Sequence, residues 1–256
     1  MKSVYGPVSS WRLGKSLGVD LICSHGRICS FDCLYCQLQK IKSHTLEKDR
    51  YVSLNNVKDE LSEALKITSP DVITLSGTGE PTLSKDFPIA VEMVKSITDL
   101  PLAILTNSTM FNDIDVRSAL KKLNIVVAKL DAANEEIFNK INRPVKGITF
   151  EKTLSGIKKV RKNFNGKFCL QIMFINDNKN HADQIAEIAR EIQPDEIQIN
   201  TPLRPCPVHP LNKIEIIEIK KLFKDFKKVI TVYEASKEKV IPIDLDEVYK
   251  RKRPEP

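Results

Sequence analysis

The chain has 256 residues, 41% of them hydrophobic and 29% charged, which suits one full-sized domain with a large core. Met1 to Ser10 contain no apolar segment typical of a signal peptide, and no apolar run approaches the roughly 20 residues that a membrane span requires. We therefore expect a cytoplasmic protein with no membrane partner, whose net charge of +7 permits binding to nucleic acid without demanding it.

Short β-branched runs alternate with longer amphipathic segments along the chain. Val57, Leu61 and Leu65, for example, recur at i, i+4 and i+8, the spacing of one helical face. The expected elements are a strand over 19–22, a helix capped by Ser53 or Asn55, a strand over 71–76, a helix over 87–97, a strand over 102–105, a helix over 115–123, a strand over 125–130, helices over 134–141 and 151–163, a strand over 168–175, a helix over 181–192, a strand over 196–199, a helix near 213–225 and a strand near 228–233.

This alternation predicts an α/β fold, a partial (β/α)6-type barrel with parallel strands covered by helices. No linker divides the chain, so we expect a single domain over 1–256, with an N-terminal extension at 1–18 and a frayed basic tail at 249–256. In such folds the chemistry belongs at the carboxyl ends of the strands. The residues that follow the predicted strands are therefore the first candidates for a site.

Four of the six cysteines lie between positions 23 and 36, and Cys29, Cys33 and Cys36 have the spacing C-x3-C-x2-C. In a reducing compartment, such crowding indicates metal ligation rather than disulfides. Three thiolates around a four-iron cubane leave one iron without a protein ligand, where a small molecule can bind. A zinc site instead needs four ligands, and Cys23 or His25 could supply the fourth. Unrelated buried cysteines are the remaining alternative.

The cysteine loop, near the N-terminal end of an alternating β/α chain, resembles that of the radical S-adenosylmethionine (radical SAM) superfamily. The resemblance implies that Cys29, Cys33 and Cys36 bind a [4Fe–4S] cluster, whose fourth iron is chelated by the amino and carboxylate groups of S-adenosylmethionine (SAM). It also implies a reducing donor of the flavodoxin or ferredoxin type. One electron from the reduced cluster then cleaves SAM to a 5′-deoxyadenosyl radical, which takes hydrogen from a substrate.

A glycine-containing segment follows the predicted strand over 71–76. Gly77 and Gly79 would permit close backbone approach to a ligand, and Glu80 would offer a carboxylate to an ammonium group. The segment resembles the Gly-Gly-Glu element of the superfamily, which holds the methionyl amino group of SAM, although Thr78 separates the two glycines here. The alternative is a simple turn in which Pro81 begins a helix.

Five further residues complete the candidate cofactor site. Tyr35 could pack against the adenine ring or only shield the cluster from water. Asn107 resembles the asparagine of the family's Thr-Asn-Gly, with serine in place of the glycine, and Asn200 ends a strand where the family often places adenine. Asp131 could bind ribose hydroxyls or cap a helix. Arg143 could pair with the SAM carboxylate or with an acidic group at the surface.

The segments 5–20, 76–83, 130–133, 142–144 and 198–201 resemble a subgroup often labelled wyosine-synthetase-like iron–sulfur oxidoreductases. True wyosine synthases modify a guanosine of transfer RNA, so the resemblance and the basic charge point to a tRNA base as substrate. A radical SAM activase or modifier of a peptide or protein is the alternative. A non-enzymatic iron–sulfur or zinc protein is the second alternative.

Three cysteines stand outside the C-x3-C-x2-C motif. Cys23 is an extra thiol of the same loop. Cys169 lies inside a predicted strand and is interpreted as a small buried hydrophobic residue. Cys206 lies in a loop near the proposed carboxyl face, where it could touch the substrate or a second cluster.

Overall fold

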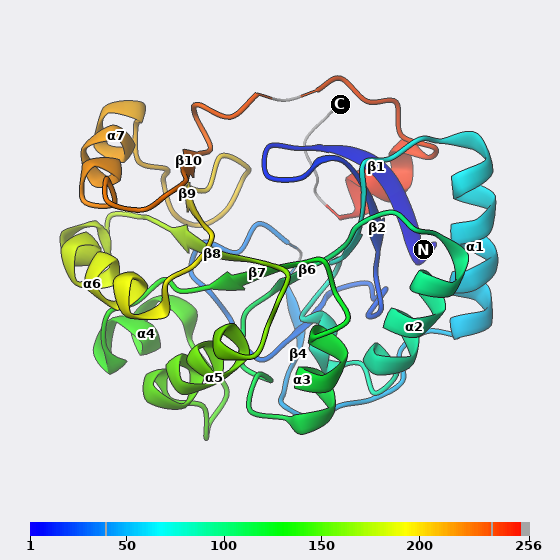
Figure 1. The fold of residues 1–256 in the computed structure, drawn as a ribbon, viewed down its shortest axis with the longest axis horizontal. Coiled ribbons are helices and arrows are strands. Elements are labelled where there is room, and N and C mark those ends of the chain that lie inside the picture. The colour runs from blue at the N-terminus through cyan, green and yellow to red at the C-terminus, as the bar shows by residue number, and fades with distance from the viewer. Residues whose placement is uncertain (39, 237, 252–256) are drawn as a thin grey trace.

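Within the described residues, 1–38, 40–236 and 238–251 of a computed structural model, a curled sheet of eight strands forms the centre of the molecule (Figure 1). The strands neighbour one another in the order β1-β2-β5-β6-β7-β8-β9-β10, and all pairs are parallel except β1 with β2. They are β1 (Val4–Ser10), β2 (Gly14–Val19), β5 (Val72–Leu75), β6 (Leu102–Thr106), β7 (Ile125–Lys129), β8 (Lys167–Met173), β9 (Glu196–Asn200) and β10 (Val229–Thr231).

Helices surround the outer side of this sheet (Figure 1). They are α1 (Leu54–Ile67), α2 (Phe87–Ile97), α3 (Ile114–Leu120), α4 (Glu135–Asn142), α5 (Phe150–Lys162), α6 (Ala182–Ile192), α7 (Lys213–Lys221) and α8 (Leu245–Lys250), with short 3-10 helices at Pro81–Leu83 and Lys179–His181. The predicted α/β partial barrel of parallel strands is therefore confirmed, with one antiparallel strand, β1, added at its edge. No helix in the described part of the chain is long and apolar enough to cross a membrane.

The main core lies between the sheet and the helices. At the start of α1, the side chain of Ser53 accepts a hydrogen bond from the Asn56 N–H over 3.5 Å, as its role as a cap predicts. Val57 and Leu61 on this helix are fully buried. Burial of each such side chain contributes roughly 1.5–3 kcal/mol. The spacing of apolar residues therefore fixes which face of α1 meets the sheet.

Residues 1–18, expected as an N-terminal extension, instead belong to the main sheet. They form the β1–β2 hairpin, and β2 then pairs in parallel with β5. The strand predicted over 19–22 is displaced toward the N-terminus, since β2 ends at Val19. The cause is Asp20, whose Oδ1 accepts hydrogen bonds from the N–H groups of Ile22 (3.1 Å) and Cys23 (2.9 Å) and turns the chain out of the sheet.

The expectation of a frayed tail from residue 249 is wrong for its first three residues. Tyr249 and Lys250 lie in α8, and Arg251 is 1% exposed; residues 252–256 lie outside the described residues. After β10 the chain runs along the top of Figure 1 and returns to the N-terminal strand, where the Ile243 N–H donates to the Gly6 carbonyl over 2.7 Å. The C-terminal segment thus joins the two edges of the open sheet.

Candidate cofactor site

An open cavity of about 390 Å³ lies at the carboxyl ends of the parallel strands. Strands β5 to β9 contribute residues at or beside these ends, among them Ser76, Asn107, Lys129 and Met173. The cysteine loop and the β1–β2 turn complete the walls. Nine candidate site residues line this cavity: Cys29, Cys33, Tyr35, Cys36, Gly77, Gly79, Glu80, Asn107 and Asn200.

The three cysteines of the motif lie at the end of a short strand and in the loop that follows it. Cys29 ends β3 (Arg27–Cys29), which pairs in parallel with β4 (Ile41–His44). Its sulfur accepts hydrogen bonds from the Phe31 N–H and from Asn107 Nδ2, both over 3.5 Å. Asn142 Nδ2 donates to the sulfur of Cys33 over 3.6 Å. Such N–H donors stabilise sulfur ligands of a cluster and help to set its potential.

Protonation of these thiols depends on what they bind. Burial, with the nearby Glu80 carboxylate, raises the pKa of Cys29 far above its ordinary value. Burial and the adjacent Cys36 raise the pKa of Cys33 to about 12. Both are therefore thiols at neutral pH without a metal, and bound iron would have to hold them as thiolates. Burial alone would lower the pKa of Arg27, but Cys36 and Cys29 raise it when their sulfurs are thiolates, so its guanidinium would supply compensating charge to iron-bound sulfurs.

The donor set fits a cluster better than a single ion. Among the described residues, no three His, Cys, Asp or Glu side chains converge as one metal ion would require. His25 is exposed, and the Cys23 sulfur instead donates to the Met1 carbonyl over 3.5 Å. A mononuclear zinc site with either as fourth ligand is therefore not formed. A cubane presents a separate iron to each thiolate, which three cysteines around one cavity can satisfy.

Glu80 is buried at the wall of the cavity and accepts hydrogen bonds from the 3-10 helix that follows it and from the end of β6. Its Oε1 accepts from Thr82 Oγ1 and Thr106 Oγ1, each over 2.6 Å, and from the Thr82 N–H over 3.2 Å. Its Oε2 accepts from the Asn107 N–H over 2.7 Å. Burial raises the pKa of Glu80, while these donors oppose the rise. Among the described residues, Oε2 accepts this one hydrogen bond whereas Oε1 accepts three, so Oε2 retains room for a ligand's ammonium group.

The two glycines beside Glu80 serve the packing of the protein itself. A Cβ on Gly79 would lie 1.9 Å from the Ile28 carbonyl oxygen, and one on Gly77 would lie 1.9 Å from Asp20 Cγ. The Glu80 N–H donates to that same Ile28 carbonyl over 3.0 Å. Only glycine lets the strand leading to Cys29 approach the Glu80 segment so closely. The alternative prediction, a turn in which Pro81 begins a helix, is also confirmed. Glu80 is the N-cap of the 3-10 helix Pro81–Leu83.

Asp131 is 4% exposed and does not line the cavity, although Tyr35, which it holds, does. The Tyr35 hydroxyl donates to Asp131 Oδ2, and Asn142 Nδ2 donates to both groups over 3.0 Å. The Met173 N–H donates to Asp131 Oδ1 over 2.7 Å. The helix-capping alternative for Asp131 is wrong, since Asn134 caps α4. Its carboxylate instead anchors the cysteine loop, through Tyr35, to the residues that follow β7.

Arg143 and Asn200 have different surroundings from each other. The Arg143 side chain is exposed and outside the cavity, because this residue ends α4 in a left-handed conformation with φ of 47°. Its carbonyl accepts from the Asp32 N–H over 3.0 Å, so its backbone supports the cysteine loop. Asn200 lines the cavity, and its Oδ1 accepts from the Thr201 N–H over 2.9 Å.

Several cavity residues were not predicted from the sequence. Lys129 ends β7, with its Nζ 3.4 Å from Asp131 Oδ1 and 5.0 Å from the centre of the Tyr35 ring. A charged lysine at the end of an otherwise apolar strand could have indicated this residue from the sequence. Trp11 and Arg12 reach the cavity from the β1–β2 turn, with the arginine 5.2 Å from the tryptophan ring. No periodic pattern marks that turn.

Comparison with known proteins decides the family. The model of the Radical SAM superfamily matches residues 23–189, a span that includes the three motif cysteines and Glu80. The chain belongs to this superfamily. It is a radical SAM enzyme, and the cofactors of such enzymes are a [4Fe–4S] cluster and SAM. This confirms the resemblance seen in the sequence and removes the non-enzymatic alternative.

Relatives of this radical SAM protein include proteins without a named reaction. A UPF0026 protein of Synechocystis is 38% identical over 80% of this chain and 77% of its own length. A UPF0026 protein of Methanocaldococcus jannaschii is 33% identical over 90% of this chain and 73% of its own. A Brachyspira hyodysenteriae protein named GTPase Obg is 38% identical over 87% of this chain, which spans only 33% of that longer protein.

Solved structures share the fold at low sequence identity. A radical SAM methyltransferase from Sphaerobacter thermophilus has a TM-score of 0.63 at 14% identity, covering 84% of this chain and 66% of its own. SuiB of Streptococcus suis bound to SAM has a TM-score of 0.62 at 11% identity, covering 83% of this chain and 50% of its own. At these identities the likeness establishes the common architecture of radical SAM proteins and does not identify a substrate.

Proposed function

We propose that this protein reductively cleaves SAM at a [4Fe–4S] cluster held by Cys29, Cys33 and Cys36, and that the resulting 5′-deoxyadenosyl radical abstracts hydrogen from a substrate bound in the cavity. The observation that carries the proposal is the meeting of these three thiols with the Glu80 carboxylate in one cavity. When bound, the cluster and SAM supply the one-electron chemistry, and the protein supplies position and electrostatics.

The protein's own residues have distinct tasks in this proposal. Oε2 of Glu80 accepts a hydrogen bond from the ammonium group of SAM, a charge-assisted contact in a buried setting. Asn107 and Asn142 donate to two of the cysteine sulfurs. Tyr35, anchored by Asp131, packs beside the cluster and excludes water from it. Asn200 and Gly77 belong to the wall of the SAM site.

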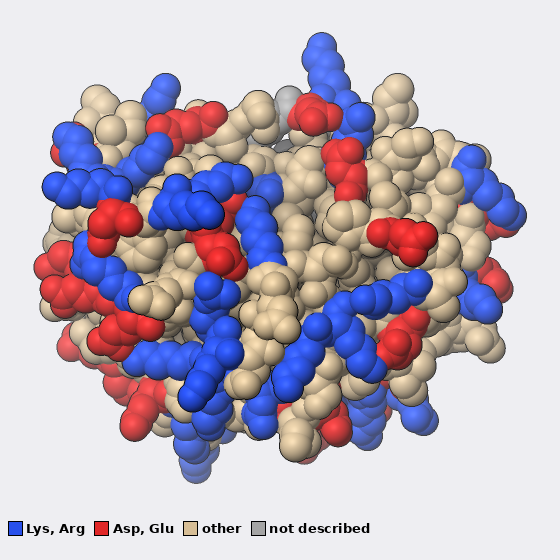
Figure 2. Space-filling model, in the orientation of Figure 1, with Lys and Arg blue, Asp and Glu red and all other residues tan. Residues whose placement is uncertain are grey.

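A transfer-RNA base is the proposed substrate. The support is the net charge of +7, together with the arginines Arg12 and Arg204, which line the cavity. Figure 2 shows lysine and arginine side chains spread over one face, many beside acidic residues, so on this face the positive charge is not gathered in a single patch. The proposed reductant is of the flavodoxin or ferredoxin type. A cytoplasmic location belongs to the same proposal, because thiol ligands stay reduced there.

The test of the chemistry is anaerobic reconstitution with iron and sulfide, followed by SAM and dithionite. We expect bound iron and sulfide and release of 5′-deoxyadenosine. An intact cluster without SAM cleavage contradicts the proposed function, and so does a protein that takes up only zinc. Ile185→Ala in α6, which is buried away from the cavity, controls for general destabilisation. Its cleavage activity should equal that of the wild-type protein.

The substrate is tested separately by equilibrium binding of mixed tRNA over a range of salt concentrations. We expect an affinity that falls steeply with salt, as phosphate contacts require. The variant Arg204→Ala should bind tRNA more weakly, because Arg204 lines the cavity and carries positive charge. It should retain SAM cleavage, because the Arg204 side chain hydrogen-bonds to Gln37 and not to a motif cysteine. Absence of tRNA binding at low salt contradicts the tRNA proposal and favours a peptide or protein substrate.

A further inference from the structure

Arg251, the last described residue of the chain, has a fully buried side chain. Its Nε lies 3.1 Å from Asp20 Oδ2, and its Nη1 lies 3.0 Å from Glu247 Oε2. Its Nη2 donates to the Lys2 carbonyl over 2.6 Å. The guanidinium therefore lies between the carboxylates of Asp20 and Glu247. It also joins the end of α8 to Lys2, at the opposite end of the chain.

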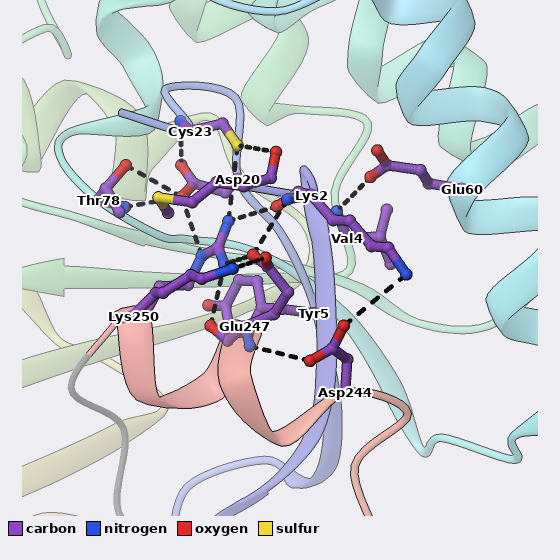
Figure 3. Close-up of polar contacts among 12 residues, drawn as sticks. Lys2, Val4, Tyr5, Asp20, Cys23, Glu60, Thr78, Asp244, Glu247 and Lys250 are labelled. Carbon is purple, nitrogen blue, oxygen red and sulfur yellow. Dashed lines mark hydrogen bonds and ion pairs between the residues drawn. The ribbon is translucent and has the colours of Figure 1, made fainter. Parts of the chain in front are cut away.

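The first connection from Arg251 to the cofactor site passes through Asp20. This carboxylate is 1% exposed, and its Oδ2 accepts from both the N–H and the Oγ1 of Thr78 over 3.0 Å. Thr78 Oγ1 in turn accepts from the Ser24 N–H over 3.0 Å. Asp20 therefore fixes the segment that leads to Glu80 and the segment that leads to the cysteines. Figure 3 shows Asp20 beside Thr78, with dashed lines marking the hydrogen bonds between them.

The second connection passes through Tyr5 of β1. The centre of its ring lies 4.4 Å from the Arg251 guanidinium carbon, a cation–π contact. The Tyr5 hydroxyl donates to the Ser76 carbonyl over 3.2 Å and lies 3.0 Å from Ser76 Oγ. Ser76 and Thr78 both belong to the segment that ends at Glu80. Two separate chains of contacts thus run from one guanidinium to the same five-residue segment.

We propose that Arg251 is a positioning residue for SAM. It holds Asp20 and Tyr5 in place, and these two residues hold the segment Ser76–Glu80 where the Glu80 carboxylate can contact the cofactor. The inference rests on the proposed function of Glu80. Removal of the guanidinium leaves the buried carboxylate of Asp20 without a cationic partner, which is costly in a protein interior. Asp20 then draws water or moves, and Thr78 moves with it.

The decisive experiment compares Arg251→Ala with Arg251→Lys in the reconstituted protein. We expect Arg251→Ala to raise the KM for SAM in 5′-deoxyadenosine formation about tenfold with a smaller change in kcat, as lost ground-state binding predicts. The equilibrium Kd for SAM should rise by a similar factor. Lysine retains the charge but not the fork that spans Asp20, Glu247 and Lys2, so Arg251→Lys should recover only part of the affinity.

Chemical rescue separates positioning from stability. Guanidinium ion at low millimolar concentration should restore SAM affinity to Arg251→Ala, whereas the same concentration of sodium chloride should not. In the metal-free protein, hydrogen exchange should accelerate at the amides of Thr78 and Glu80 in Arg251→Ala. Ile185→Ala, with a buried change in α6, is the control for loss of stability alone.

Each outcome bears on one of the two proposals. If wild-type protein forms a cluster and binds SAM while Arg251→Ala matches Ile185→Ala in SAM affinity and in exchange at Thr78 and Glu80, Arg251 is only structural and the inference is overturned. If the wild-type protein itself does not bind SAM, the proposed function fails. Faster exchange at Thr78 in Arg251→Ala would in that case still support the mechanical coupling.

Discussion

Oε2 of Glu80 accepts a hydrogen bond from the Asn107 N–H over 2.7 Å, which ties the segment after β5 to the end of β6. The Asn107 side chain continues the connection, because its Nδ2 donates to Ser30 Oγ over 2.8 Å and to the Cys29 sulfur over 3.5 Å. The carboxylate proposed to bind SAM and a thiol proposed to bind iron are therefore parts of one hydrogen-bonded assembly.

Glu80→Gln should weaken SAM binding while iron is still taken up. The amide has one acceptor oxygen in place of two and carries no charge, so the charge-assisted contact to the ammonium group is lost. A loss of about 1.5–3 kcal/mol corresponds to a rise in Kd of roughly tenfold to a hundredfold. Isothermal titration of SAM into the reconstituted protein measures it. Glu63→Gln, in an exposed pair with Lys66, is the control, and equal affinities in the two variants would refute the role.

Alanine at Cys29, Cys33 or Cys36 should abolish cluster binding. Iron should fall from about four atoms per chain to less than about one, because a cubane with two protein thiolates is poorly held. Iron and acid-labile sulfide analysis after anaerobic reconstitution gives the answer.

The chain contains its own controls for this series. Cys23 contacts Met1 and Arg251, Cys169 is buried beside Glu196, and the Cys206 sulfur donates to the Val208 carbonyl over 3.2 Å. Cys206 also lies outside the cavity lining. Alanine at each of these three positions should leave the iron content unchanged. Lost iron in Cys206→Ala would instead support the second-cluster alternative considered for that residue.

Most of the parallel strands were predictable because they are short runs rich in apolar and β-branched residues, although β9 alternates its isoleucines with buried polar residues. Every residue of β5 and of β9 is buried, as strands covered on both faces require. The β1–β2 hairpin was not, because glycines and serines obscure its alternation. Gly18, for example, is needed where a Cβ would lie 2.2 Å from the Tyr5 ring. That requirement comes from a tertiary contact, which the order of residues does not reveal.

The candidate site divides in the same way. The cysteines are marked by their C-x3-C-x2-C spacing, whereas Glu80 became a ligand candidate only through the resemblance of its segment to the Gly-Gly-Glu element of the superfamily. The role of Asp131 depends on its hydrogen bonds with Asn142, the last residue of α4, and with Tyr35 of the cysteine loop. The outward direction of Arg143 follows from its left-handed backbone. Neither property is encoded in a local pattern.

Gly79→Ala should prevent assembly of the site. The added methyl group would meet the Ile28 carbonyl at 1.9 Å, so the strand before Cys29 must move away from Glu80. We expect loss of both cluster and SAM binding, measured by iron content and titration. Gly147→Ala is the control: its φ of 97° costs roughly 1–2 kcal/mol, but a Cβ there has no neighbour within 4 Å. Normal iron content in Gly79→Ala would show that the close approach is dispensable.

Glu247 should make the docking of α8 sensitive to acid. Burial alone would raise its pKa, but hydrogen bonds from Lys250, Arg251 and the Lys2 N–H lower the pKa from 4.5 to about 2. A carboxyl group with a lowered folded-state pKa contributes stability that is present above pH 4.5 and is lost as the pH falls toward 2.

Glu247→Gln should therefore be less stable at neutral pH and show a weaker loss of stability in acid. Between pH 4.5 and 2 the wild-type free energy of unfolding should fall more steeply than that of the variant, by at most about 1.4 kcal/mol per pH unit. Urea denaturation of the metal-free protein at several pH values measures both curves. Glu218→Gln, which breaks an exposed pair with Lys221, should follow the wild-type curve. Parallel wild-type and Glu247→Gln curves would mean that protonation of Glu247 does not lower the free energy of unfolding. The contact that places Arg251 beside Asp20 would then not depend on the charge of this carboxyl group.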